Sequence, residues 1–477
     1  MACEFCRSVF ENGVALMVAS MRLASSLPAY GRSRAVFIFV GVFFLAGAVQ
    51  YAPAAFSDSS SSTPLYWRFQ ETDLEQVGPL RYVKDAVLLL FGAYWPFVVS
   101  RFPSAIHALF KYAVWFLAVL CFGLIAYVAD TGFLPFVTAG LRWLLILHAA
   151  VGVAALALLG RSSAFSERFM VTMLIAICLF DLYPVLRQLG GASVANLAVI
   201  RLPGMFSNAG TAGYFSVACG ILALISTKAG PGRCWSLAVL SLLIAATSGT
   251  RYAILANLLL MISSYSRSSS RAGLNLKVIR TYLLFFVIVP SALIGGVALI
   301  AFAGRDGLVD QQMAQGGRLA NLLLVWDEIE RADAFDVLFG RGIGVGTNTA
   351  QGIAAANQID PLSVKWNILI DNTIVTTFLQ LGLLGSVLVW VGVASMLWPL
   401  ARKEAVPILI VIALGLITQN MFEQYFLMLA FALGLAVTRK SSFEVKSRPM
   451  LGAFDGNAPG LYSRSRAGRQ LRRSNSV

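Results

Sequence analysis

The sequence predicts an all-α polytopic membrane protein of about 12 transmembrane helices with one large folded loop, because apolar runs of about 20 residues recur along it. Two further observations support this fold class. Of the 477 residues, 58% are hydrophobic and 13% are charged, a balance outside the range of soluble globular domains. The basic residues also gather in alternate segments between the apolar runs, as expected when those segments face the cytoplasm.

The first part of the chain begins with a predicted cytoplasmic segment, residues 1–34, in which no signal-peptide core with a cleavage site is found. Residues 35–303 then hold the predicted spans one to nine. Polar loops over 57–81 and 187–209 separate some of these spans on the outer side. The spans are expected at 35–55, 83–99, 109–129, 139–159, 169–186 and 210–226, twice within 234–265, and at 281–303.

Two apolar stretches, residues 234–265 and 406–437, are each too long for one membrane-spanning helix and short for two. Each has a polar interruption at its centre. The first contains Thr-Ser-Gly-Thr-Arg, ending at Arg251, and the second contains Thr-Gln-Asn-Met-Phe-Glu-Gln, beginning at Thr418. We therefore expect two tight helical hairpins that turn at the outer membrane surface. Treating either stretch as one span would place the basic C-terminal tail outside, against the usual distribution of Lys and Arg.

The large loop, residues 304–370, is the only long segment between spans that the pattern predicts to be folded. Apolar residues recur in it at helical spacing, which predicts an amphipathic helix over 317–331. We expect this helix to act as a lid over the outer end of the helix bundle. The residues that form the apolar face are Leu319, Leu322, Leu323, Trp326 and Ile329.

The last part of the chain, residues 371–438, holds the predicted spans ten to twelve, and residues 439–477 form a predicted disordered, basic cytoplasmic tail. In this arrangement about two thirds of the 37 Lys and Arg residues lie inside, and about three quarters of the 23 Asp and Glu residues lie outside. Topology thus accounts for the net charge of +14 without a nucleic-acid partner. With only 2 histidines and no second Cys-x-x-Cys pair, we expect no metal site and no cofactor.

Because the predicted outer face is acidic, three outward arginines are candidate ligands for an anion. Arg201 opens the segment Arg-Leu-Pro-Gly-Met-Phe-Ser-Asn, in which proline and glycine break the chain before a span. Arg251 lies at the apex of the first hairpin, and Arg318 lies in the first turn of the lid helix. A guanidinium offers a planar fork of donors that suits a phosphate. The alternative is an arginine that reaches lipid head groups or pairs with a carboxylate.

Polar residues beside the last spans are the candidates for proton transfer, and several polar or aromatic residues along the outer side are candidates for contact with sugars. Asp371 and Glu423 are the candidate general bases. The alternative for Asp371 is the N-cap of span ten. For Trp326, packing is preferred to a platform on which a sugar stacks. The candidate glycan contacts are Asn208, Trp326, Asn372 and Asn420.

Three further features have structural alternatives. The run Phe-Gly-Arg-Gly-Ile-Gly-Val-Gly over 339–346 lacks the strand-to-helix context of a dinucleotide fingerprint, and a flexible turn is preferred to a phosphate-binding nest. His148 is expected to make a buried hydrogen bond rather than to transfer protons. Asp181 is expected to pair with an arginine or to act as an acid, and as a catalytic candidate it ranks below Asp371 and Glu423.

The order of these motifs resembles that of the O-antigen ligase and polymerase superfamily, over roughly residues 201–385. The motifs that carry the resemblance are Arg201-x-Pro-Gly-x-Phe-Ser-Asn, Thr-Ser-Gly-Thr-Arg251, an outer loop with Gly317-Arg318, Trp326 and Gly340-x-Gly-x-Gly, and Asp371-Asn372 followed by Leu381-Gly-Leu-Leu-Gly385. Single motifs are loose, but their order and spacing are together fairly specific.

The resemblance implies an inverting, metal-independent glycosyltransferase at the periplasmic face of the inner membrane. It implies undecaprenyl-diphosphate-linked glycans as substrates, with the diphosphate held by Arg201, Arg251 and Arg318, and chain-length and export proteins as candidate partners. Ligases of this family typically have a His-Asn pair where this chain has Asp371-Asn372. A polymerase of exopolysaccharide or O-antigen repeat units therefore fits better than a ligase. The alternative from another class is a polysaccharide transporter or flippase.

Overall fold

The computed structural model describes residues 32–49, 83–126, 128, 134–159, 163–190, 202, 204–206, 209–272, 318–347, 350, 372–400 and 405–446. The chain divides into two units, Met1–Arg439 and Lys440–Val477, and only the end of one helix is described in the second unit. The regular structure of the described residues is entirely helical. The predicted all-α fold is thus confirmed for this part of the chain.

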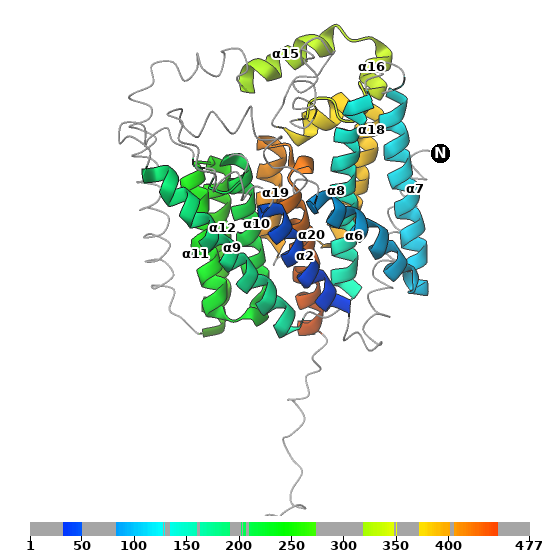
Figure 1. The fold of residues 1–477 in the computed structure, drawn as a ribbon. Coiled ribbons are helices and arrows are strands. Elements are labelled where there is room, and N and C mark those ends of the chain that lie inside the picture. The colour runs from blue at the N-terminus through cyan, green and yellow to red at the C-terminus, as the bar shows by residue number, and fades with distance from the viewer. Residues whose placement is uncertain are drawn as a thin grey trace, which may run out of the picture. The chain divides into compact units, whose positions relative to one another are not determined.

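The helices follow one another along the first unit with short turns between several of them (Figure 1). In chain order they are α2 (Arg32–Val49), α6 (Val83–Ser100), α7 (Pro103–Ala126), α8 (Leu134–Leu159), α9 (Ala164–Gly190), α10 (Ala209–Ile225), η4 (Thr227–Ala229), α11 (Pro231–Ser248), α12 (Arg251–Ala272), α15 (Arg318–Glu330), α16 (Ala334–Phe339), α18 (Thr373–Leu397), η6 (Trp398–Leu400), α19 (Val406–Thr418), η8 (Met421–Glu423) and α20 (Tyr425–Lys446).

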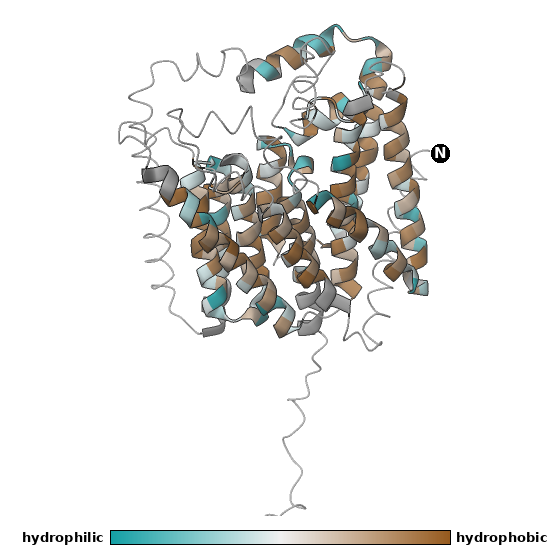
Figure 2. Ribbon diagram, viewed as in Figure 1, coloured by the Kyte–Doolittle hydropathy of each residue, from teal (hydrophilic) through white to brown (hydrophobic). Residues whose placement is uncertain are grey.

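Five of these helices are long and apolar enough to cross a membrane by length and composition. They contain the segments Val83–Ser100, Ala105–Ile125, Val137–Leu159, Ala164–Leu186 and Thr373–Leu397. Each overlaps a predicted span, and shorter apolar helices occupy five further predicted positions. Figure 2 shows that the helices are hydrophobic over most of their length, with hydrophilic residues mainly near their ends. The predicted span 281–303 lies outside the described residues.

Both long apolar stretches consist of two helices joined by a short turn, as the sequence predicts. In the first, α11 and α12 pack against each other and are joined by Gly249 and Thr250. In the second, α19 is joined to α20 through η8. Gly249 ends α11 in the left-handed conformation, with φ 61° and ψ 17°, and its N–H bonds the carbonyl of Ala246. Glycine adopts this conformation without the cost that a side chain adds.

Helix α10 lies at the centre of a group formed with α11 and α12, and α11 also packs against α9. Every side chain from Ala212 to Ile225 is buried. A polar cluster joins the three central helices: Asn257 donates to Ser216 at 3.0 Å and accepts from Ser241 at 3.1 Å. Interhelical hydrogen bonds of this kind and close approach at small residues hold apolar helices together.

Helices α6, α7 and α8 form a second group, to which α16 and α18 add through α7. Helix α2 contacts both groups, through α9 on one side and through α6 and α8 on the other. One face of α7 exposes Ile106, Phe110, Val114 and Leu117. A continuous apolar stripe on an otherwise packed helix is expected to face lipid.

Helix α18 is broken at Gly382, which has φ 62° and ψ −168°. At the break, the carbonyls of Leu379 and Gln380 accept hydrogen bonds from outside the helix. The donors are the backbone N–H groups of Arg341, at 2.8 Å, and Gly342, at 3.0 Å. Irregular backbone inside an apolar bundle is tolerated only when its polar groups find such partners.

The glycine run that supplies these partners is neither a flexible turn nor a phosphate nest. The N–H groups of Arg341 and Gly342 bond carbonyls of α18, that of Ile343 bonds the carbonyl of Gly123 in α7 at 3.2 Å, and that of Gly340 bonds the carbonyl of Asp336 in α16 at 2.7 Å. The residues from Gly340 to Thr347 are buried. Positive φ angles between 72° and 101° at Gly340, Gly342, Gly344 and Gly346 explain why glycine alternates here. The glycine run lets the chain pass closely between α7 and α18.

Replacing Gly382 by alanine tests this close passage. The new Cβ would lie 2.4 Å from the backbone of Leu338, at a φ that disfavours any side chain. We expect Gly382→Ala to lower the free energy of unfolding by at least about 3 kcal/mol or to prevent folding. Gly232→Ala is the control, because a Cβ there meets nothing within 4 Å. Thermal unfolding of the detergent-purified proteins measures the stability of both variants. Equal stability would contradict the close packing of Gly382 against the backbone of Leu338.

Candidate functional site

The turn that carries Arg251 is fixed by close packing against α10. Thr250 is buried, and a Cβ added to Gly213 of α10 would lie 2.7 Å from the Thr250 side chain. Arg251 begins α12 directly after this turn and is exposed. The backbone under Arg251 is therefore rigid, while its side chain remains accessible to a ligand.

The segment after Arg201 lies against this same turn. The N–H of Leu202 donates to the carbonyl of Thr247 at 3.1 Å. Further along, the N–H of Met205 donates to Asp181 Oδ1 of α9 at 2.7 Å. Arg201 and Asn208 lie outside the described residues, but the residue that follows Arg201 is bonded to the turn before Arg251. The structure thus places Leu202 beside the end of α11, next to the turn before Arg251.

Asp181 has a structural role that the sequence did not predict. Besides its bond to Met205, it leaves no room for a side chain at Gly204, whose φ is +62° and whose added Cβ would lie 2.1 Å from Oδ1. Asp181 is fully buried. It fixes the loop that follows Arg201, and no arginine pairs with it among the described residues.

A second cluster forms where α18 begins beside the turn between α19 and α20. The hydroxyl of Thr373 donates to the carbonyl of Gln419 at 2.7 Å and accepts from the N–H of Met421 at 2.9 Å. Asn372 is the N-cap of α18, because its side-chain oxygen accepts from the N–H groups of Ile374 and Val375. Its amide donates to the carbonyl of Ile417 at 3.0 Å.

These contacts give Asn372 a structural role. The N-cap role considered for Asp371 belongs to Asn372, whose amide is committed to protein partners and is thus poorly placed to bind a glycan. Asn420 is buried, with 4% of its surface exposed. Glu423 ends η8 and is half-buried. Asp371 lies outside the described residues, directly before Asn372.

Two tyrosines connect the arginine turn to this second cluster. Tyr252, which follows Arg251, donates from its hydroxyl to the carbonyl of Val411 in α19 at 3.1 Å. Its ring centroid lies 6.4 Å from that of Tyr214 in α10. The Tyr214 hydroxyl donates to the side-chain carbonyl of Gln419. The predicted cationic and carboxylate parts of the site therefore border one connected set of buried side chains.

The sequence pattern did not point to Tyr214, Tyr252 or Thr373. Thr373 could have been suspected from its position beside Asp371-Asn372, because a threonine at a helix start offers a hydroxyl to nearby backbone. The tyrosines gave no signal, since each lies within an apolar span where an aromatic ring reads as packing. Their hydroxyls become informative only when the helices are placed side by side.

The predicted lid helix forms as α15, but its apolar face differs from expectation. Arg318 begins α15, and its side chain lies outside the described residues. Leu323 and Trp326 are exposed, at 47% and 61%. Trp326 is therefore not packed against the bundle, which was the role preferred for it from the sequence. Its indole N–H donates to Glu330 Oε1 at 2.5 Å, which fixes the ring on the helix surface.

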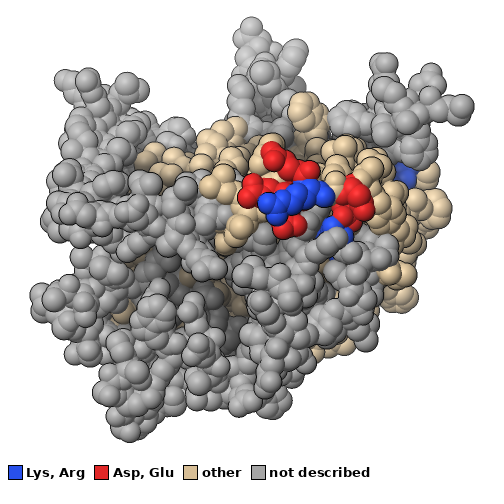
Figure 3. Space-filling model, turned by 90° about the horizontal axis from the view of Figure 1, so that it is seen from above, with Lys and Arg blue, Asp and Glu red and all other residues tan. Residues whose placement is uncertain are grey.

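Several exposed charged residues follow this tryptophan along the chain. On α15 and the turn after it, the exposed charged residues are Asp327, Glu330, Arg331 and Asp333. Figure 3 shows acidic side chains gathered around a basic one on the face seen from above. An exposed indole beside carboxylates is a surface on which a sugar ring can stack while its hydroxyls are hydrogen-bonded.

His148 makes the buried hydrogen bonds that the sequence predicts. The Tyr112 hydroxyl lies 2.8 Å from Nδ1, while Nε2 lies 3.1 Å from both the Trp95 indole nitrogen and the Gly92 carbonyl. The rings of Trp95, Tyr112 and Phe116 pack around the imidazole. Among the described residues, no group of three His, Cys, Asp or Glu side chains is placed to hold a metal ion.

Comparison with known proteins adds no relative to this picture. No protein-family model, no curated protein and no solved structure matches the chain.

Thr373 offers a direct test of how the second cluster is held. Thr373→Val keeps the shape of the side chain but removes both hydrogen bonds, leaving the N–H of Met421 and the carbonyl of Gln419 buried without that partner. We expect a loss of about 2 kcal/mol in unfolding free energy. Thr373→Ser, which keeps the hydroxyl, should lose less than half as much. Chemical unfolding in detergent measures both, and an equal loss in the two variants would show that the methyl group rather than the hydroxyl matters.

Proposed function

We propose that this protein polymerises undecaprenyl-diphosphate-linked oligosaccharide repeat units, as an inverting membrane glycosyltransferase. The observation that carries the proposal is the hydrogen bond from Leu202 N–H to the Thr247 carbonyl. It ties the chain next to Arg201 to the turn that presents Arg251. Two arginines on adjoining segments would offer a diphosphate two guanidinium forks, which match its oxygen atoms better than isolated charges do.

The carboxylate side of the site supports the same reaction. Asp371 precedes Asn372, which is bonded to α19, and Glu423 lies at the end of η8 in the adjoining turn. Through Gln419, Tyr214 and Tyr252 this turn is linked to the helix that begins with Arg251. A general base and a cation site on neighbouring turns are the two parts that a glycosyl transfer needs.

In the proposed step, a hydroxyl oxygen of the acceptor glycan attacks the anomeric carbon of the donor chain. The bond from that carbon to the diphosphate oxygen breaks, and undecaprenyl diphosphate leaves with the electron pair. The hydroxyl proton passes to Asp371 or Glu423. Arg201 and Arg251 offset the charge that grows on the leaving diphosphate, which stabilises the transition state more than the ground state.

The proposal includes a membrane arrangement. The protein spans the inner membrane about 12 times, with both termini in the cytoplasm and the segment 304–370 as a periplasmic lid. The five long apolar helices and the hairpins α11–α12 and α19–α20 support it. Arg318 and Trp326 on α15 would then close the site over the bound glycan, as mobile lids do in other enzymes.

Arg251 provides the test. In proteoliposomes supplied with lipid-linked repeat units, we expect the wild-type protein to lengthen glycan chains. Arg251→Gln should lower kcat/KM by at least about 100-fold, because a charge-assisted contact to the leaving group is lost, and Arg251→Lys should recover only part of it. Gel analysis of the lipid-linked products measures chain length.

Arg233→Gln is the matched control, because Arg233 is an exposed arginine near the start of α11, the other helix of the same hairpin. It should leave polymerisation unchanged. Transfer of glycan to a lipid A core acceptor without chain lengthening would indicate a ligase. Movement of lipid-linked glycan across the bilayer without any new glycosidic bond would indicate a flippase, and either result would overturn the proposed reaction.

A further inference from the structure

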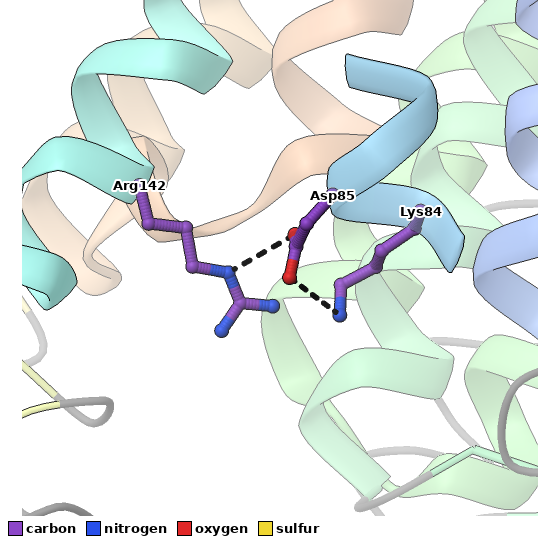
Figure 4. A network of polar contacts seen from close by, with 3 residues as sticks. All are labelled: Lys84, Asp85 and Arg142. Atoms are coloured by element: carbon purple, nitrogen blue, oxygen red, sulfur yellow. Dashed lines mark ion pairs between the residues drawn. The ribbon is translucent and has the colours of Figure 1, made fainter. Parts of the chain in front are cut away.

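A charged cluster formed by Lys84, Asp85 and Arg142 lies outside the site described above. Lys84 Nζ is 3.9 Å from Asp85 Oδ2, and Arg142 Nε of α8 is 3.5 Å from Asp85 Oδ1. Figure 4 shows the Asp85 carboxylate between the two cationic groups. Two cations share one carboxylate, so this set of three side chains carries a net positive charge.

The exposure of these groups suits a ligand more than a structural ion pair. Only 3% of the Lys84 side chain is exposed, yet 32% of Arg142 and 28% of Asp85 remain accessible. Arg142 touches Asp85 through Nε at a distance longer than a good hydrogen bond. Within the described part of the chain, its two terminal amino groups make no other polar contact. Both amino groups can donate the paired bonds that a phosphate accepts.

The cluster borders the turn that holds Glu423. Trp143, next to Arg142, stacks on Phe422 of η8 with ring centroids 5.2 Å apart. Lys84 Nζ lies 5.6 Å from the ring centroid of Tyr425, at the start of α20. Gln419 of the same turn contacts Tyr214 and so leads to the Arg251 side. The turn from Gln419 to Tyr425 is therefore in contact with both cationic regions.

Resting on the proposed function, we infer that Lys84 and Arg142 bind the diphosphate of the second lipid-linked glycan, the acceptor. Polymerisation joins two lipid-linked chains, so two lipid diphosphates are present at the membrane surface in each cycle. Their negative charges repel, and each needs its own cationic partner. A lysine buried beside apolar helices occurs mainly at functional sites, and Lys84 lies in one cluster with Asp85 and the accessible guanidinium of Arg142.

The first experiment counts binding sites. The purified full-length protein is placed in nanodiscs of phosphatidylcholine, and undecaprenyl diphosphate is titrated in. We expect two sites in the wild-type protein and one in Arg142→Gln, with one site recovered in part by Arg142→Lys. Arg101→Gln removes a similar charge near the other end of α6 and should leave both sites. A single wild-type site, or two sites that survive Arg142→Gln, would overturn the inference.

The same titration separates lipid diphosphate from an ordinary anionic lipid. If the cluster instead holds a lipid head group, nanodiscs containing phosphatidylglycerol should block one of the two sites. Loss of that site in phosphatidylglycerol would overturn the assignment to an acceptor. Retention of both sites, together with the effect of Arg142→Gln, supports it.

The second experiment separates acceptor from donor in the polymerisation reaction. With a preformed long-chain donor and a single-repeat acceptor, Lys84→Gln and Arg142→Gln should each raise the KM for the acceptor about tenfold and leave the KM for the donor unchanged. A rise in the donor KM alone would overturn the inference while the proposed reaction stands. The wild-type protein could instead form no polymer and still show two diphosphate sites, one of which is lost in Arg142→Gln. In that outcome the proposed reaction fails and the second binding site stands.

Discussion

The structure depends on the need to pair every backbone N–H and C=O group inside an apolar helix bundle. At two places in the described part of the chain, a distant segment supplies the partners that a helix end or a helix break leaves unpaired. The glycine run 340–346 does this for the break in α18 at Gly382. Thr373 does it for the turn between α19 and α20. Because such partners must come from elsewhere in the chain, each break also fixes two distant segments against each other.

The candidate site follows from the same requirement. Leu202 bonds the turn before Arg251, Asp181 holds the loop around Met205, and Gln419 bonds Tyr214. Two of these contacts involve groups at a helix end, Thr247 in the last turn of α11 and Gln419 just after α19, where polar atoms outnumber their local partners. The turns that carry Arg251 and Glu423 are thus held by buried bonds, while their charged side chains are exposed or half-buried. A turn whose backbone is held in place and whose charged side chain is accessible is the arrangement that preorganised catalysis needs.

Some positions were assigned wrongly from the sequence for reasons that the packing explains. Trp326 looked like part of a packing face, but its indole bonds Glu330 and the ring remains exposed. The glycine run looked like a flexible turn, because its partners in α7 and α18 are far away in sequence. The N-cap of α18, which was the alternative role for the candidate base Asp371, is formed by the neighbouring Asn372.

The sequence by itself determined the helical class, most helix positions and both hairpins. The reason is that the length of an apolar segment and the polar residues that interrupt it are local properties, which decide whether the segment can form a helix in a membrane. It also singled out Arg251 and Glu423 as charges beside turns. Only the tertiary structure decided which turns meet. The tyrosine bridge from Tyr252 through Tyr214 to Gln419, and the sharing of Asp85 by Lys84 and Arg142, join helices far apart in the chain. Such pairings depend on how whole helices pack, and no local pattern encodes them.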